Sequence, residues 1–106
     1  MSIATIETQP RVQDVEITGN MLSIRLIDGR VLSIPLAWYP RLMHASEDER
    51  EEWRVIEDSE ERDIIFWESL DELIPIVALL AGVPSRESRC SLDRWLAGRS
   101  SHETKQ

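Results

Sequence analysis

Residues 12–35 read VQDVEITGNMLSIRLIDGRVLSIP, and this segment alone predicts a three-stranded antiparallel β-meander. Apolar and polar side chains alternate on both sides of two turn sequences, which is the pattern of strands with one buried face. The first turn, Gly19-Asn20, has glycine in its first position and suits a type II′ hairpin loop. Closing the hairpin there pairs Ile17 with Leu22, and the remaining apolar pairs fall on the same face.

The second turn admits two registers. A two-residue loop of Asp28 and Gly29 leaves Leu32 and Ile34 facing away from the other apolar side chains. A three-residue loop that includes Ile27 turns them inward, and it places Gly29 in the left-handed position of a type I turn with a G1 bulge. We therefore predict the three-residue loop. The predicted inner face consists of Val15, Ile17, Leu22, Ile24, Leu32 and Ile34.

Further elements are predicted after Pro35, which ends the third strand or lies on an edge. Residues 36–44 predict a short helix or turn that contains Pro40. Ser46 and Glu49 form a capping box that begins a helix over 47–52. Strands over 53–56 and 63–67 flank a charged turn at 57–62, and they form either a separate hairpin or an extension of the meander.

Two helices are predicted in the last third of the chain. The first has Pro75 in its first turn, runs through a buried apolar segment over 75–81 and ends before Gly82. The second begins at Ser85 or Ser88 and stops at Gly98. Its inner stripe is predicted to consist of Leu92, Trp95 and Leu96. The fold class is thus α+β: one domain over 11–98 with an N-terminal antiparallel meander, two further short strands, short helices and a C-terminal helix, flanked by flexible tails at 1–10 and 99–106.

Length and composition indicate an ordinary small domain. The 106 residues are enough for one hydrophobic core, and no apolar run approaches the length of a membrane span. The N-terminus lacks the pattern of a signal peptide, and the single cysteine, Cys90, cannot form an internal disulfide. These features predict a cytoplasmic location. Near the start of a helix, Cys90 is expected to be a small buried residue.

Charge is concentrated in the middle of the chain. The net charge is −8, while residues 47–72 contain 13 Asp and Glu against 3 Arg, a local balance of −10. Such a segment repels phosphate and suits a basic protein surface, so it disfavours general nucleic-acid binding. Glu51 and Glu52 are chosen from it as candidate partner-binding residues. The alternative is a solvated face that only keeps the protein soluble.

The sequence contains no catalytic or metal-binding signature. The only histidines are His44 and His102, and the four isolated glycines provide no phosphate loop, nucleotide fingerprint or nucleophile elbow. EF-hand spacing is also missing. We therefore expect no enzyme activity, no metal and no cofactor.

Four tryptophans are many for a chain of this length. Trp67 and Trp95 lie in apolar patterns and are expected to anchor the core. Trp38 and Trp53 flank the acidic segment, where they can serve either the core or a partner surface. They join Glu51 and Glu52 in the candidate binding site.

A set of motifs resembles a small bacterial family known as domain of unknown function 2442. The motifs are Leu26-Ile27-Asp28-Gly29-Arg30, Trp38-Tyr39-Pro40-Arg41-Leu42, Ser46-x-x-Glu49-Arg50, Trp53, Ile65-x-Trp67, Leu70-Asp71-Glu72 and Leu79-Leu80-Ala81-Gly82. The resemblance covers about residues 10–97. Typical members have His and Pro where this chain has Phe66 and Glu68, so no role of those residues is carried over.

The resemblance implies an α+β domain that begins with a meander and has no established active site. Its members are often encoded beside another small domain, in an arrangement similar to toxin and antitoxin. Some members carry a helix-turn-helix domain, for which this chain is too short after Gly98. We therefore expect an antitoxin-like or adaptor module that binds a basic protein.

Two other functions remain open at this point. One is transcription-related DNA binding through the last helix, using Arg86, Arg89, Arg94 and Arg99. The other is a homodimer in which an open edge of the meander pairs with its twin.

Overall fold

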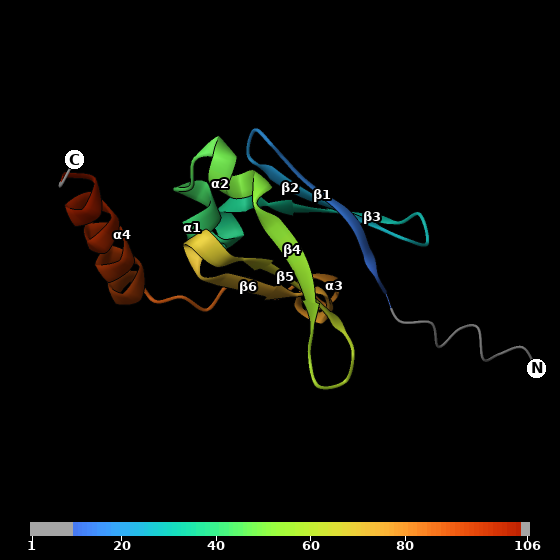
Figure 1. Ribbon diagram of the computed structural model, residues 1–106. Helices are drawn as coiled ribbons and strands as arrows, with labels where there is room; N and C mark the ends of the chain where they lie inside the picture. The colour runs from blue at the N-terminus through green and yellow to red at the C-terminus, as the bar shows by residue number, and fades with distance from the viewer. Residues whose placement is uncertain (1–9, 105–106) are drawn as a thin grey trace, which may run out of the picture.

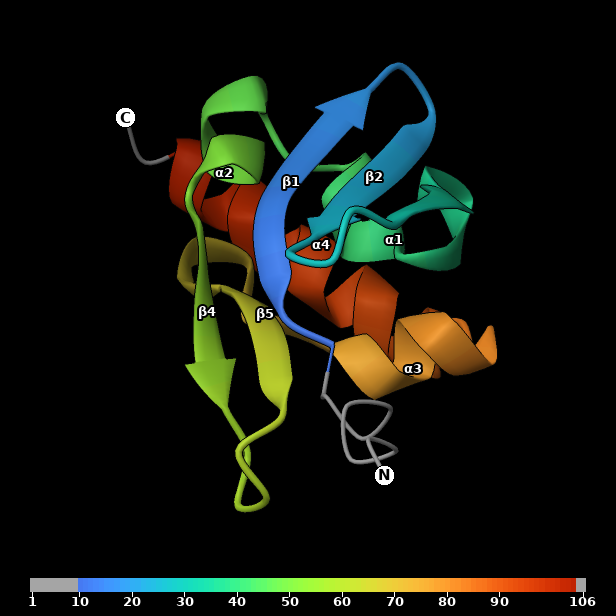
Figure 2. The ribbon, with the colours of Figure 1, turned by 90° about the vertical axis from the view of Figure 1, so that its right-hand side faces the viewer.

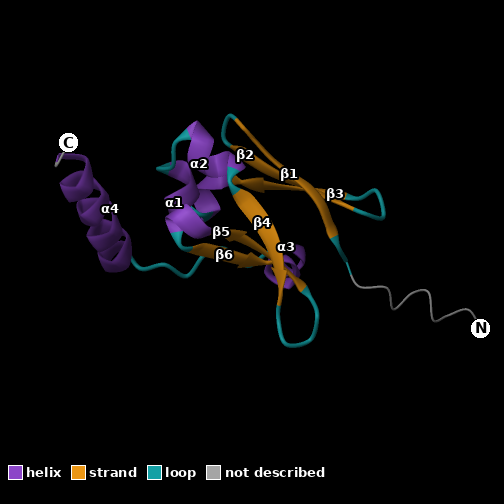
Figure 3. Cartoon of the chain, in the orientation of Figure 1, coloured by secondary structure: helices purple, strands orange, loops and turns teal. Residues whose placement is uncertain are grey.

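The computed structural model describes residues 10–104, with side chains described as far as Arg99. Within this part, six strands form two antiparallel sheets, ordered β1-β2-β3 and β4-β5-β6 (Figures 1 and 3). The strands are β1 Val12–Thr18, β2 Met21–Leu26, β3 Val31–Pro35, β4 Trp53–Glu57, β5 Asp63–Trp67 and β6 Glu72–Pro75. The α-helices are α1 Pro40–Met43, α2 Glu47–Glu51, α3 Ile76–Ala81 and α4 Arg89–Thr104, with 3-10 turns η2 Leu36–Trp38 and η3 Glu68–Leu70. The α+β class is confirmed.

The meander has the predicted register. Ile17 pairs with Leu22, and Ile24 pairs with Leu32 on the other side of β2. The loop glycines adopt positive φ, +59° at Gly19 and +100° at Gly29, where a side chain would be strained. The Gly29 N–H donates to the Leu26 carbonyl at 3.0 Å, as the three-residue loop requires. The predicted inner face is only partly sealed, since Ile17 and Leu32 are half-buried.

The later strands form a sheet of their own and do not extend the meander. This second sheet includes β6, which sequence reasoning missed. Pro75, predicted in the first turn of a helix, is the last residue of β6 and precedes α3. The helix itself is present and begins one residue later than predicted, at Ile76. Strand β6 forms because Asp71 adopts a left-handed conformation, φ +54°, which reverses the chain and returns it alongside β5.

Predictions for the helices had mixed outcomes. The capping box of α2 is present, with reciprocal bonds between Ser46 and Glu49. The α3 helix is less buried than predicted, because only Ile76 and Leu79 of its apolar residues are enclosed. The predicted stop at Gly98 is wrong: α4 continues through it to Thr104.

The last helix, α4, stands at one side of the molecule and is joined to the rest by the chain that follows α3 (Figure 1). Its predicted inner stripe is half-buried, and Trp95 packs against the edge of the core. Cys90 is exposed, which corrects the expectation of a buried residue. Ser88 and Arg89 beside it are exposed as well, so the start of α4 does not enter the core.

Both sheets contribute to one hydrophobic core. Ile24 of the first sheet and Ile65 and Trp67 of the second are fully buried in the same cluster. The Trp67 indole N–H donates to the Arg50 carbonyl at 3.0 Å, so its polar atom is satisfied. Trp67 is therefore the core anchor that the sequence predicted.

The two sheets are pinned together at one end by a buried carboxylate. Asp63, at the start of β5, is 4% exposed and accepts bonds from the Arg11 guanidinium and the Val12 main-chain N–H, both at 2.8 Å. Arg11 also reaches Glu57 at the end of β4. Beyond this junction, β1 and the start of β4 stand on either side of a groove.

Candidate functional site

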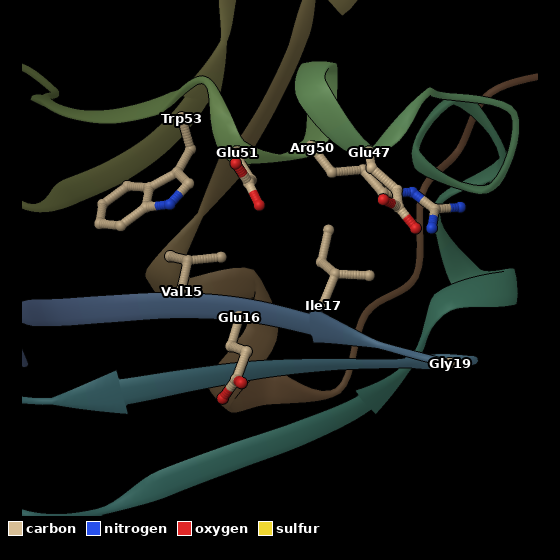
Figure 4. A pocket seen from close by; sticks show the side chains of 8 residues that line it. All are labelled: Val15, Glu16, Ile17, Gly19, Glu47, Arg50, Glu51 and Trp53. Atoms are coloured by element: carbon tan, nitrogen blue, oxygen red, sulfur yellow. The ribbon is translucent and has the colours of Figure 1, made fainter.

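The groove lies between β1 of the first sheet and the α2–β4 segment. Its volume is about 520 Å³, within the range of ligand-binding clefts. Eight residues line it: Val15, Glu16, Ile17, Gly19, Glu47, Arg50, Glu51 and Trp53 (Figure 4). It combines an apolar floor with acidic side chains at its rim.

Strand β1 supplies the floor. Val15 and Ile17 point toward α2 and Trp53, whereas the side chain of Glu16 points away from them (Figure 4). Gly19 has no side chain. Glu16 and Gly19 therefore line the groove mainly through their backbone, so main-chain atoms of β1 are accessible from it.

The acidic rim belongs to one face of α2. Glu47 and Glu51 are four residues apart, so both lie on the side of the helix that faces the groove. Asp48 and Glu52 are exposed elsewhere on the same segment and do not line it. The guanidinium of Arg50 donates to the Leu42 and Met43 carbonyls at 2.9 and 3.0 Å, which ties this cation to the end of α1.

The acidic segment as a whole does not form one free surface. Seven of its carboxylates pair with arginines: Glu49, Glu57, Asp58, Glu60, Asp63, Glu68 and Asp71. No ion pair with a described residue involves the other six, which are Glu47, Asp48, Glu51, Glu52, Glu61 and the buried Glu72. Four of these six lie in or directly after α2, so the exposed unpaired charge is concentrated beside the groove.

The structure brings together half of the predicted binding residues. Glu51 and Trp53 line the groove, while Glu52 is exposed outside it. Trp38 is half-buried against the core, and its carbonyl accepts a bond from the Ser85 N–H at 3.1 Å. The sequence offered a signal that reasoning missed for Glu47: its i, i+4 spacing from Glu51.

The four arginines proposed for DNA binding do not form one free basic face. Arg89 pairs with Asp93 within α4. Arg99 pairs with Glu49 at 2.9 Å, and its guanidinium lies 4.7 Å from the ring centre of Trp95. These contacts use its cationic group to dock α4. Arg86 and Arg94 are exposed.

A second pocket, of about 320 Å³, surrounds Glu72 and was not predicted from the sequence. Burial is the main cause that raises the pKa of Glu72 to about 7; the charge of Arg41 opposes this shift, and those of Glu87 and Asp71 add to it. Tyr39 lines the same pocket. Its pKa is raised to about 12, mainly by burial and to a smaller extent by the negative charge of Glu72. Glu72 lies next to Asp71 in the acidic segment, but only the fold encloses it.

Among residues 10–99, whose side chains the structure describes, no cluster of three or more His, Cys, Asp or Glu is arranged to hold a metal ion. None of the helices in the described part of the chain is both long enough and apolar enough to cross a membrane.

The family model described as "Protein of unknown function (DUF2442)" matches residues 12–85. Among solved structures, a protein of unknown function from Rhodospirillum rubrum ATCC 11170 is similar at 21% sequence identity and a TM-score of 0.58. The match covers 76% of this chain and 95% of that one, and at this identity it supports the fold alone. No curated protein matches this chain. The matched range contains both β1 and α2, and therefore the groove.

Proposed function

This chain belongs to the family of proteins of unknown function DUF2442, and from that premise we propose that it is a protein-binding module whose groove receives a cationic segment of a partner. The observation that carries the proposal is the placement of Glu47 and Glu51. Both carboxylates border a groove with an apolar floor, and neither forms an ion pair with a described arginine. Arg50 also lines this groove, but its guanidinium bonds to main-chain carbonyls at the end of α1. Acidic rims around apolar contacts favour basic partners by charge complementarity.

The proposed role is that of an antitoxin-like or adaptor component. An acidic groove competes with phosphate for the same lysines and arginines, so it can cover a nucleic-acid-binding surface of its partner. Support comes from the charge pattern, since neutralisation elsewhere in residues 47–72 leaves α2 as the main source of free negative charge. Trp53 supplies an aromatic contact at the same place.

The test compares two charge reversals on one helix. The first variant carries Glu47→Lys and Glu51→Lys, which line the groove; the matched control carries Asp48→Lys and Glu52→Lys, which do not. Both change the net charge equally, and both place one lysine in the first turn of α2. Binding of capped lysine-rich peptides is measured by calorimetry, with glutamate-containing peptides as the negative probe.

We expect the groove variant to lose at least tenfold in affinity and the control to stay within about threefold. Equal losses in both variants would show that only the overall charge matters and would overturn the groove as the site. Tight, salt-dependent binding of duplex DNA to the unmodified chain would favour the C-terminal helix instead. For the antitoxin-like role, co-purification with the product of the adjacent reading frame must be lost in the groove variant alone.

A further inference from the structure

One edge of the meander has main-chain groups that no other strand uses. In β2, the Leu26 N–H donates toward β3, to the Arg30 carbonyl at 2.8 Å. Since main-chain groups alternate in direction along a strand, even-numbered residues of β2 face β3 and odd-numbered residues face β1. The bond from the Ile27 N–H to the Arg11 carbonyl, 2.9 Å, agrees with this assignment.

The alternation then fixes the direction of each β1 residue. Glu16 and Thr18 pair with Ser23 and Met21, which are odd-numbered, so their N–H and C=O groups bond to β2. Val15 and Ile17 lie between these pairs, and their N–H and C=O groups point away from β2. No hydrogen bond joins these outward groups to another residue of the described chain.

The outward groups lie along the free edge of β1, next to the groove that Val15 and Ile17 line with their side chains. Figure 2 shows β1 with β2 on one side and β4 and β5 on the other. At the closed end of the groove, the outward N–H of Val12 is already satisfied by the Asp63 carboxylate. Farther along, Val15 and Ile17 line the open groove. Along this edge of β1, the outward N–H of Val12 is therefore hydrogen-bonded, whereas the outward groups of Val15 and Ile17 are not bonded to a described residue.

We propose that the open edge of β1 binds an extended cationic segment of a partner protein as an added β-strand. This inference rests on the proposed function and specifies how the partner binds. Main-chain bonds to Val15 and Ile17 supply affinity in this mode, and side chains of alternate residues supply specificity. The span from Val15 to Gly19 accommodates about five extended residues at ~3.3 Å each.

Charge argues that the occupant is a partner and not a second copy of this chain. Glu47 and Glu51 favour lysine or arginine on the incoming strand. Strand β1 itself carries Asp14 and Glu16 and no basic residue, so pairing two β1 edges brings like charges together. A partner segment in which apolar and basic residues alternate supplies apolar side chains for Val15 and Ile17 and cationic side chains for Glu47 and Glu51.

The test uses a capped peptide of about seven residues in which lysine and valine alternate. Two N-methylated forms block alternate sets of peptide amides, so that only one form blocks the amides that face β1. We expect this form to bind at least tenfold more weakly than the parent peptide. The other form is expected to bind within about threefold of it.

Amide exchange of the full chain provides a residue-level measurement. In the free protein, we expect the amides of Val15 and Ile17 to exchange quickly and those of Glu16 and Thr18 to be protected by their bonds to β2. Peptide binding is expected to slow exchange at Val15 and Ile17 at least tenfold and to leave the other two almost unchanged. These neighbours act as internal controls within one strand.

The outcomes separate the two proposals. If cationic peptides bind through Glu47 and Glu51 but neither N-methylated form is weakened, strand addition is overturned and the proposed function stands. If no cationic peptide binds, the proposed function fails and the inference fails with it. A stable dimer by light scattering, with Val15 and Ile17 protected before any peptide is added, would show that a second copy occupies the edge and would overturn the assignment to a partner.

Discussion

Arg41 and Glu87 form a bidentate ion pair between the α1 segment and the chain that leads into α4. Arg41 Nε donates to Glu87 Oε1 at 2.9 Å, and Nη2 donates to Oε2 at 2.7 Å. The remaining amino group of Arg41 donates to the Leu70 carbonyl at 3.1 Å. The same guanidinium lies 5.1 Å from the ring centre of Trp95. One planar cation therefore joins α1, η3 and α4.

The substitution Arg41→Lys is expected to loosen α4. Lysine cannot reproduce the planar two-bond contact with Glu87, so the docking of α4 should weaken by about 1–3 kcal/mol. Hydrogen exchange measured by mass spectrometry should show faster exchange over residues 89–99 and unchanged exchange in β2. The control is Arg89→Lys, which alters an exposed pair on the same helix and should change little. Unchanged exchange in the Arg41 variant would refute this role.

Stability is expected to fall as the pH rises from about 4.5 to about 7. Burial raises the pKa of Glu72 from 4.5 to about 7, so in this window the folded state keeps a proton that the unfolded state releases. The contribution of Glu72 is complete below pH 4.5 and lost above pH 7. Glu72→Gln should therefore stabilise the protein at pH 8 by ~1–3 kcal/mol. Denaturant unfolding at several pH values measures this, and exposed Glu52→Gln is the control.

Removal of the buried carboxylate at the sheet junction should be costly. Asp63→Ala leaves the Val12 N–H without its partner and is expected to lower the free energy of unfolding by about 2–4 kcal/mol. Asp63→Asn should cost less, since an amide oxygen still accepts that bond. Glu57→Gln, at the exposed end of the same arginine network, should have little effect. Equal stability of all three variants in urea would contradict this account.

Two glycine-to-alanine substitutions are expected to have opposite signs. Gly98 lies inside α4 without a positive φ, and no atom is close to the added methyl group, so Gly98→Ala should stabilise the helix by about 0.5–1 kcal/mol. Gly82 ends α3 at φ +74°, where alanine is strained by ~1–2 kcal/mol. Thermal unfolding of both variants measures the difference. A destabilising Gly98→Ala would mean that α4 does not continue through this position.

Local chemistry explains where sequence reasoning succeeded. Gly19 and Gly29 each demand a particular turn, and the alternation around them leaves one register that buries the apolar side chains. Ser46 and Glu49 satisfy each other within a single turn of α2. Such features depend on residues a few positions apart, so one sequence is enough to predict them.

Reasoning failed where a distant partner decides the outcome. Glu72–Pro75 becomes a strand because β5 offers an edge beside it. The α4 helix does not end at Gly98, because the ion pair between Arg99 and Glu49 stabilises the helix beyond that position. Glu51 lines the groove and Glu52 does not, because only one side of the α2 segment faces β1. A charge count along the sequence treats the two residues alike.

The amino-acid sequence determined the meander, its two turns, the capped helix and the negative charge of residues 47–72, because each follows from periodicity, backbone preference or composition. Only the tertiary structure decided that arginines pair with seven of the thirteen carboxylates, that Glu47 and Glu51 border a groove, and that Val15 and Ile17, which line it, keep main-chain groups that β2 does not use. The physical reason is that pairing, burial and accessibility arise between residues far apart in the chain, once both sheets share one core.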